Sequence, residues 1–140
     1  AIGCAQLESI SEILKKRKFV ELHYKKKLKT LKNLEIRSYK DWCSPVSWLI
    51  TLRLKTKQLN LRNKLIYFLQ SKGIDARPMI RPVHEAKHFK KFFNKNKYPN
   101  SSVQSKTSFH LPSSPNLSLK KIDYVCSQVS LFVKKNEKKF

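Results

Sequence analysis

The sequence of 140 residues contains only two glycines, Gly3 and Gly73, and this scarcity excludes several kinds of site. A loop that wraps a phosphate, of either the P-loop or the dinucleotide type, needs several closely spaced glycines. A G-x-S-x-G nucleophile motif is absent as well. Three Asp and six Glu are too few and too scattered to pair readily as catalytic carboxylates. The composition therefore points away from these common catalytic arrangements.

Cysteine and long apolar runs are equally sparse. Cys4, Cys43 and Cys126 are odd in number and widely spaced, which favours neither a disulfide framework nor a CxxC metal site, and we expect a reducing, cytoplasmic setting. No run of 18 residues is free of charge, so the sequence offers no candidate membrane span. His84 and His88 lie four residues apart, but HExxH and the usual Cys/His spacings of zinc are missing, and we predict no metal site.

Positive charge is what the sequence has in excess. Lys and Arg number 31 against nine Asp and Glu, for a formal net charge of +22. Such an excess suggests a nucleic acid or an anionic membrane surface as a partner. However, 25 of the cations are Lys and only six are Arg, the residue on which phosphate and base recognition usually depends. A nucleic-acid-binding module, with Phe89, Phe92 and Phe93 as stacking residues, is therefore an alternative and not the main interpretation.

The first 31 residues predict one long amphipathic helix, because apolar residues recur at steps of three and four. The stripe consists of Leu7, Ile10, Leu14, Val20, Tyr24 and Leu28. The Lys-rich runs at 15–18 and 25–29 are interpreted as solvated faces of this helix. Because the chain starts inside the apolar pattern, we expect a piece of a longer protein, with residues 1–31 as a connecting helix and residues 32–140 as a small domain.

The remaining residues predict short strands alternating with helices. Residues 47–54 alternate as a half-buried strand. Its buried side is predicted to hold Trp48, Ile50, Leu52 and Leu54. Helices are predicted at residues 61–72, where Gly73 ends the helix, at residues 85–93, and after Ser118, which acts as the N-cap. A strand is predicted at residues 107–111, and loops are predicted at residues 32–45 and 94–102. The tail from residue 134 is expected to fray. This order predicts an α+β fold, a small sheet with helices packed on it.

The densest polar cluster consists of Arg77, Arg81 and His84, on a segment stiffened by Pro78 and Pro82. A loop that follows a strand is where a scaffold commonly presents ligand contacts. Arg can bind a phosphate or carboxylate through two parallel hydrogen bonds, and His can donate or accept a proton near neutral pH. The alternative is that Arg77 is a surface cation and that His84 makes only a local hydrogen bond.

Three segments resemble, in order, pieces of one known family. Residues 1–18, AIGCAQLESISEILKKRK, resemble A-I-G-x-A-Q-L-E-x-L-x-x-I-x-x-x-R. Residues 60–91 resemble a helix followed by G-I-x-x-R-P-x-x-x-P-x-H, and residues 109–125, FHLPSSPNLSLKKIDYV, are similar to L-x-L-P-x-x-x-x-L-x-x-x-x-I-x-x-V. These motifs are typical of the pyridoxal-phosphate-dependent sugar aminotransferases of the DegT/DnrJ/StrS group.

The resemblance implies the C-terminal part of a fold-type-I aminotransferase, namely the connecting helix and the small α+β domain. The lysine that forms the Schiff base with pyridoxal 5'-phosphate would lie upstream, so no catalytic or cofactor-binding residue is assigned in this chain. His84 first, and Arg77 second, are expected to contact the substrate. Relatives often differ at Met79, at Ile80 and at 85–87, which leaves the identity of the sugar open.

The implied activity transfers an amino group, from glutamate, to a nucleotide-linked keto sugar for surface-polysaccharide or antibiotic sugar synthesis. The intact enzyme is expected to be a homodimer, and the 140 residues alone are not expected to be active. A dehydratase of the same family is an alternative, because it differs at the Schiff-base position, which this chain does not contain. An interaction domain without chemistry is the third interpretation.

Overall fold

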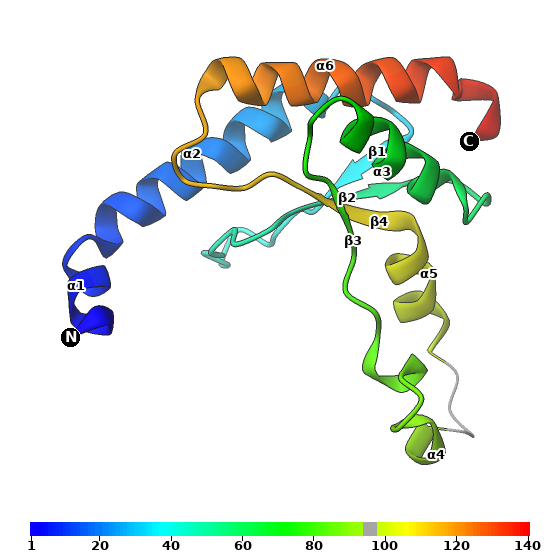
Figure 1. Ribbon diagram of the computed structural model, residues 1–140, viewed down its shortest axis with the longest axis horizontal. Helices are drawn as coiled ribbons and strands as arrows, with labels where there is room; N and C mark the ends of the chain where they lie inside the picture. Colours follow the sequence, from blue (N-terminus) through cyan, green and yellow to red (C-terminus); the bar gives the residue numbers. More distant parts are fainter. Residues whose placement is uncertain (94–97) are drawn as a thin grey trace.

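A computed structural model describes residues 1–93 and 98–140, and its described part combines a small antiparallel sheet with helices (Figure 1). The elements are α1 (Ile2–Glu8), α2 (Ile10–Leu28), β1 (Leu34–Ile36), β2 (Ile50–Leu54), α3 (Leu61–Ser71), β3 (Arg77–Pro78), a 3₁₀ turn (Val83–Glu85), α4 (Lys90–Phe93), α5 (Pro99–Thr107), β4 (Ser108–Leu111), α6 (Leu119–Lys135) and a second 3₁₀ turn (Glu137–Lys139). The strand order is β1-β2-β4-β3. The predicted α+β class is confirmed.

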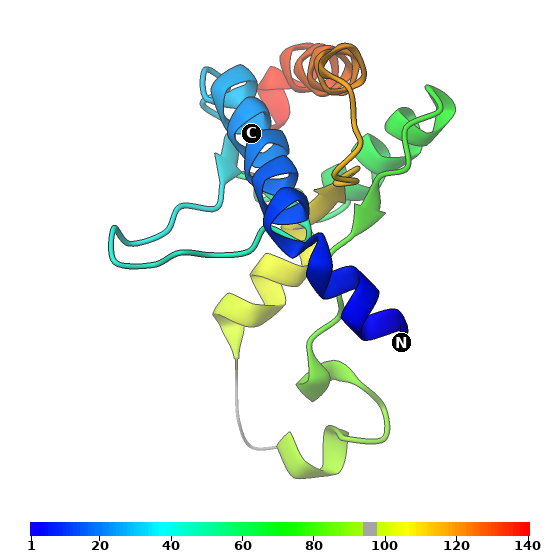
Figure 2. The ribbon, with the colours of Figure 1, turned by 90° about the vertical axis from the view of Figure 1, so that its left-hand side faces the viewer.

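Helices α2, α3 and α6 lie on one face of the sheet, where α6 contacts both α2 and α3 (Figure 1, Figure 2). The period-two alternation of β2 and β4 sends their apolar residues to this face. Leu52 pairs with Phe109 across the two strands, and both side chains are fully buried. Burying one such side chain contributes roughly 1.5–3 kcal/mol. The core therefore lies between the sheet and these three helices.

Two segments extend away from this core. The arm, residues 37–49, connects β1 to β2, and the lobe, residues 79–107 without 94–97, runs from β3 through α4 to α5 (Figure 2). Both carry exposed apolar side chains, including Trp42 and Val46 in the arm and Ile80 and Phe92 in the lobe. Among the described residues, no helix has both the length and the apolar character that a membrane span requires.

The N-terminal helix differs from the prediction in continuity and in burial. It is interrupted at Ser9, whose ψ of 6° leaves the helical region, and α2 ends at Leu28. Burial begins only at Val20, while Leu7 and Ile10 are exposed although they belong to the predicted stripe. Helix α1 buries none of its residues, so no packing in the described chain holds it in line with α2.

Two differences concern the strands. Residues 34–36, predicted as loop, form β1, because three residues beside β2 suffice for pairing but are too few to show a period. Strand β2 begins at Ile50 and not at residue 47. Trp48, predicted on the buried side, is 64% exposed because it precedes the strand and does not share its alternation.

The lobe and the tail contain the other differences. The predicted helix at 85–93 is replaced by the turn at Val83–Glu85 and the four-residue α4. Within the predicted loop at 94–102, residues 94–97 lie outside the described residues, and Pro99 opens α5, since proline is tolerated in the first helical turn. The tail is ordered rather than frayed, because Phe140 packs against the core and the Thr56 hydroxyl donates to the Lys139 carbonyl oxygen at 2.9 Å.

For helices α3 and α6, each end that the sequence predicts lies within about one residue of the observed end. Gly73 ends the first helix with a φ of 72°, a left-handed conformation that favours glycine. Ser118 caps α6, where its hydroxyl oxygen accepts a hydrogen bond from the backbone N–H of Lys121 at 3.4 Å.

We expect Tyr24→Phe to lower the free energy of unfolding by about 1 kcal/mol, because the buried Tyr24 hydroxyl donates to the Pro112 carbonyl oxygen at 3.1 Å. Urea unfolding followed by circular dichroism measures the change. Tyr67→Phe, which removes a hydroxyl from an exposed side chain of α3, is the matched control and should leave the midpoint in place. Equal effects of the two substitutions would contradict this account of how α2 is anchored.

Candidate functional site

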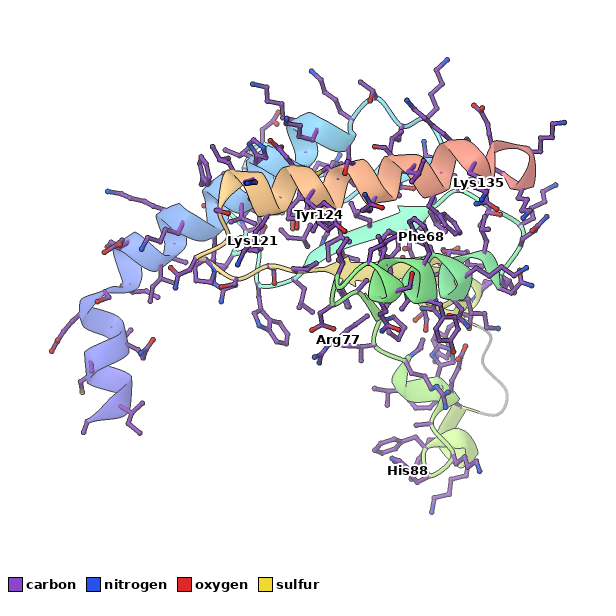
Figure 3. The ribbon with its side chains drawn as sticks, turned by 45° about the horizontal axis from the view of Figure 1, so that its top comes forward. Phe68, Arg77, His88, Lys121, Tyr124 and Lys135 are labelled. Carbon is purple, nitrogen blue, oxygen red and sulfur yellow. The ribbon has the colours of Figure 1, made fainter. Side chains whose placement is uncertain are left out.

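The face of the sheet opposite α2, α3 and α6 is lined by polar side chains, and we call it the polar face. The register pairs Glu35 with Arg53, Thr51 with His110, and Arg77 with His110. Because alternate residues of a strand share a face, these side chains lie opposite the core. Figure 3 shows Arg77 on the side of the sheet away from α6. The fold thus presents a row of charged and hydrogen-bonding groups on this face.

His110 is the most buried ionisable side chain of this row, with 8% of its surface exposed. Its Nδ1 lies 3.0 Å from the Thr51 hydroxyl oxygen, and its Nε2 is buried without a hydrogen-bond partner in the described part of the chain. Burial lowers the pKa of His110, because a charged imidazolium is poorly solvated there. The ring is therefore held neutral at physiological pH.

Arg77 lies at the sheet edge, in the two-residue strand β3, and its side chain is 73% exposed. Its Nε and Nη2 donate to the two carboxylate oxygens of Asp75 at 3.0 Å each, a bidentate arrangement. The hydrogen bond and the charge of Asp75 raise the pKa of Arg77 above its already high value. The guanidinium group of Arg77, which the sequence predicts to bind a ligand, is thus already paired with a carboxylate of the same chain.

His84 lies in the lobe, in the turn after the proline segment. Its Nε2 is 3.3 Å from the Ser102 hydroxyl oxygen, and that hydroxyl donates to Glu85 at 2.6 Å. The Tyr98 ring lies 4.8 Å from the imidazole and the Phe93 ring 6.5 Å from it, centroid to centroid. These contacts tie the turn to α4 and α5.

The structure does not place Arg77 and His84 in one site. Arg77 borders a hollow at the sheet edge, whereas His84 is packed inside the lobe. The His84 and His88 pair belongs to no group of three potential metal ligands among the residues that the structure describes. Figure 3 shows His88 at the tip of the lobe, far from Arg77.

Two hollows lie beside β3. The edge hollow, with a volume of about 380 Å³, is bordered by Trp48, Asp75, Arg77, His110 and Ser113 among others. The second hollow, about 520 Å³, is bordered by Arg62, Arg81 and Lys106 on its cationic side and by Glu85. Both share Pro78 and Ile80, so they are neighbours.

Among the residues that border the edge hollow, only Arg77 was predicted as a site residue from the sequence, whereas Trp48, Asp75 and His110 were not. The alternation between Phe109 and Leu111 places His110 opposite the core, and this was the available signal. The alternation could not have indicated that Trp48, from the end of the arm, borders the same hollow.

Two solved structures have the fold of this chain. Helicobacter pylori PseC, an aminotransferase involved in the biosynthesis of pseudoaminic acid, has the same fold over 95% of this chain and 36% of its own, with a TM-score of 0.86 and 17% identity. Escherichia coli GDP-4-keto-6-deoxy-D-mannose-3-dehydratase matches 91% of this chain and 33% of its own, with a TM-score of 0.78 and 20% identity. This chain thus has the fold of about a third of each of these two proteins.

Sequence comparison then gives the family. The profile of the DegT/DnrJ/EryC1/StrS aminotransferase family matches residues 1–130, and the chain belongs to this family. GDP-perosamine synthase of Vibrio cholerae is 27% identical over 127 residues, which are 91% of this chain and 34% of that protein. The chain therefore spans about a third of the length of this curated relative. The predicted family resemblance is confirmed.

We expect stability to fall as the pH drops below about 6.5, the range in which an ordinary histidine takes up a proton. Because burial lowers the pKa of His110 in the folded state, the unfolded chain binds this proton first. The contribution of His110 to the free energy of unfolding is thus fully present above about pH 6.5 and decreases as the pH falls toward the folded-state pKa. For one proton, this decrease is at most about 1.4 kcal/mol per pH unit.

Urea unfolding from about pH 7.5 to about pH 5 measures this slope in the chain and in His110→Gln, where we expect it to be smaller. His88→Gln, which removes an exposed imidazole of the lobe, is the control and should keep the original pH dependence. An unchanged slope in His110→Gln would show that His110 titrates alike in both states.

Proposed function

We propose that this chain is the substrate-facing C-terminal part of a pyridoxal-phosphate-dependent enzyme that transfers an amino group, from glutamate, to a nucleotide-linked keto sugar. The observation that carries the proposal is the family match over residues 1–130. The polar face supports it, because a sheet with one face buried under helices and the other lined by polar groups suits the wall of a substrate cleft. The relative from Vibrio cholerae, named for a GDP-linked amino sugar, supports GDP as the nucleotide.

The lysines of this chain do not fit the covalent partner of the cofactor. Of those whose side chains the structure describes, all but Lys25 are exposed. Lys25 is engaged by the Glu21 carboxylate at 2.6 Å. A lysine that bonds to a carbonyl cofactor must instead point into an enclosed site with its amine free to lose a proton. In this proposal the lysine and most cofactor contacts belong to another part of the enzyme.

The N-terminal helices support a connection to that other part. Leu7, Ile10 and Leu14 of the predicted apolar stripe are exposed, whereas Val20 and Tyr24 further along are seated in the core. An amphipathic helix with an uncovered apolar side has a further surface to cover. We propose residues 1–31 as the connection between two domains, and a homodimer as the working state.

A cytoplasmic role in surface-polysaccharide or antibiotic sugar synthesis completes the proposal. The three cysteines are free, with Cys4 exposed and Cys126 buried, as suits a reducing compartment. Burial raises the pKa of the Cys126 thiol to about 12, which makes it an inert part of the core.

We expect the protein that carries this chain, purified at its natural length, to form 2-oxoglutarate from glutamate when a GDP-linked 4-keto sugar is supplied. Mass spectrometry of the sugar nucleotide separates this outcome from dehydration, which the fold similarity to the Escherichia coli dehydratase keeps as a second candidate. An amino sugar supports the proposal, a deoxy keto sugar supports the dehydratase, and recovery of unchanged substrate contradicts both.

Within this function we propose that Arg77 and His84 act on the substrate side, as the sequence predicts. Arg77→Ala should raise KM for the sugar nucleotide about tenfold with little change in kcat, because an exposed charged group that binds a ligand contributes about 1.4 kcal/mol or more. His84→Ala should behave alike if its ring touches substrate. Ser102→Ala is the matched control, since it removes only the partner that holds His84.

Steady-state kinetics of the natural-length enzyme measure these effects. If Ser102→Ala reproduces the whole loss of His84→Ala, His84 serves to hold the lobe together and the substrate role is contradicted. If Arg77→Ala leaves KM unchanged, the same conclusion applies to Arg77 and its pairing with Asp75 is purely local.

A further inference from the structure

The edge hollow is bordered by His110, whose Nε2 has no hydrogen-bond partner among the described residues and no role in the proposed function. A buried polar atom without a partner costs about 1–3 kcal/mol, so such atoms are rare in native proteins. Three are found among the described residues: Glu21 Oε2, Ser47 Oγ and His110 Nε2. His110 is more than nine-tenths buried and borders the edge hollow.

The other two unsatisfied atoms have a local explanation. Glu21 and Ser47 border the same hollows, between α2 and the arm. Although burial alone raises the pKa of Glu21, the Lys25 ammonium at 2.6 Å and the nearby Ser47 hydroxyl bring that pKa below its usual value. The Glu21 carboxylate and the Ser47 hydroxyl are thus polar neighbours of each other. His110 Nε2 has no such neighbour among the described residues, and because His110 borders the edge hollow, a ligand in that hollow is a candidate partner.

The chemistry around His110 selects a hydroxyl group. A neutral imidazole carries one N–H and one lone pair, and the Thr51 hydroxyl at Nδ1 can donate or accept, so it accommodates either tautomer. Nε2 can therefore donate to or accept from a ligand. A hydroxyl group also does both, whereas a phosphate oxygen only accepts and is better matched by cations.

The charges of the two neighbouring hollows point the same way. In the edge hollow the positive charge of Arg77 is offset by the negative charge of Asp75, which it contacts through two hydrogen bonds. In the second hollow, Arg62, Arg81 and Lys106 outnumber Glu85. The edge hollow is thus the neutral member of the pair, and a polyhydroxylated ring fits it better than an anion does.

Trp48 supplies an apolar surface at the edge hollow. Its side chain is exposed, yet its backbone is fixed, because its carbonyl oxygen accepts hydrogen bonds from the Ser113 hydroxyl at 2.9 Å and from Arg17 Nη1 at 3.2 Å. An aromatic side chain on a fixed backbone, beside a few hydrogen-bonding groups, is a common composition of a small-molecule site. A hexose offers matching surfaces, an apolar C–H face and a rim of hydroxyls.

We propose that the edge hollow binds the hexose ring of a sugar nucleotide, with His110 Nε2 hydrogen-bonded to a ring hydroxyl and Trp48 packed on the C–H face. The nucleotide-linked form of the sugar rests on the proposed function. In this arrangement His110 and Trp48 contact the sugar, and the cations of the second hollow lie apart from them.

Binding of GDP-mannose and of GDP to the natural-length protein tests this proposal, by isothermal calorimetry or ligand-observed NMR. We expect His110→Phe, which keeps the ring shape and removes both nitrogens, to weaken GDP-mannose binding about tenfold, the equivalent of one lost hydrogen bond, and to leave GDP unaffected. Trp48→Ala should have the same selective effect. Trp42→Ala, which removes an exposed indole of the same arm outside the edge hollow, should change neither ligand.

His110→Gln protects the test against misfolding, because its amide restores a donor and an acceptor and should recover most of the affinity. Equal losses for GDP and GDP-mannose, or no loss for either variant, would overturn the proposal, as would a wild-type protein that binds neither ligand. If the enzyme aminates a keto sugar while the His110 variants keep the wild-type ratio of affinities, the edge-hollow assignment alone has failed. If sugar-selective binding is lost as expected but no amination occurs, the proposed function has failed and the edge-hollow assignment stands.

Discussion

The register between β2 and β4 is the constraint on which the rest of the molecule depends. Leu52 and Phe109 meet across these strands under the helices, and a shift of one strand by one residue would move the apolar residue of that strand to the other face. The same shift would bury Arg53, if β2 moved, or His110, if β4 moved, at the cost of desolvating it. Packing on the apolar face therefore fixes which groups appear on the polar face. The candidate site is a consequence of the core rather than an addition to it.

Helix α2 links this core to both borders of the edge hollow. Its Tyr24 hydroxyl binds the carbonyl oxygen of Pro112, at the end of β4, and its Arg17 binds that of Trp48, at the end of the arm. Pro112 and Trp48 both border the hollow. The helix that we propose as a connection between two domains is thus also the element that sets the positions of these two segments. The orientation of α2 and the shape of the hollow are mechanically linked.

The sequence predicts those parts of the fold in which local signals agree with burial. Helices α3 and α6 combine an apolar stripe with a glycine end or a serine cap, and both form as expected. Strand β1 is too short to show a period, and α5 begins at a proline that also suits a loop. The exposed first half of the N-terminal helix shows the same principle, because its apolar pattern predicts burial that the described residues do not provide.

The site was less predictable than the fold. The proline segment predicts one loop after a strand that carries both Arg77 and His84, whereas Arg77 lies within β3 and His84 lies in the lobe, and their separation depends on how the lobe leaves the sheet. The position of His110 opposite the core follows from alternation. Its burial there, without a partner for Nε2, depends on distant segments such as the arm, which only tertiary structure brings together. Local sequence patterns predict which face of a helix or strand a residue occupies, whereas a site also depends on contacts between segments that are distant in the sequence.

Both edges of the sheet are short. Strand β1 has three residues, and β3 has two, the second of which is Pro78 without a backbone N–H. An edge of this length offers few free donors and acceptors to a strand of another molecule. With a net charge of +22 adding mutual repulsion, the sheet resists growth by the addition of further strands. A domain whose sheet is proposed to present one face to a ligand is thereby guarded against presenting its edges to copies of itself.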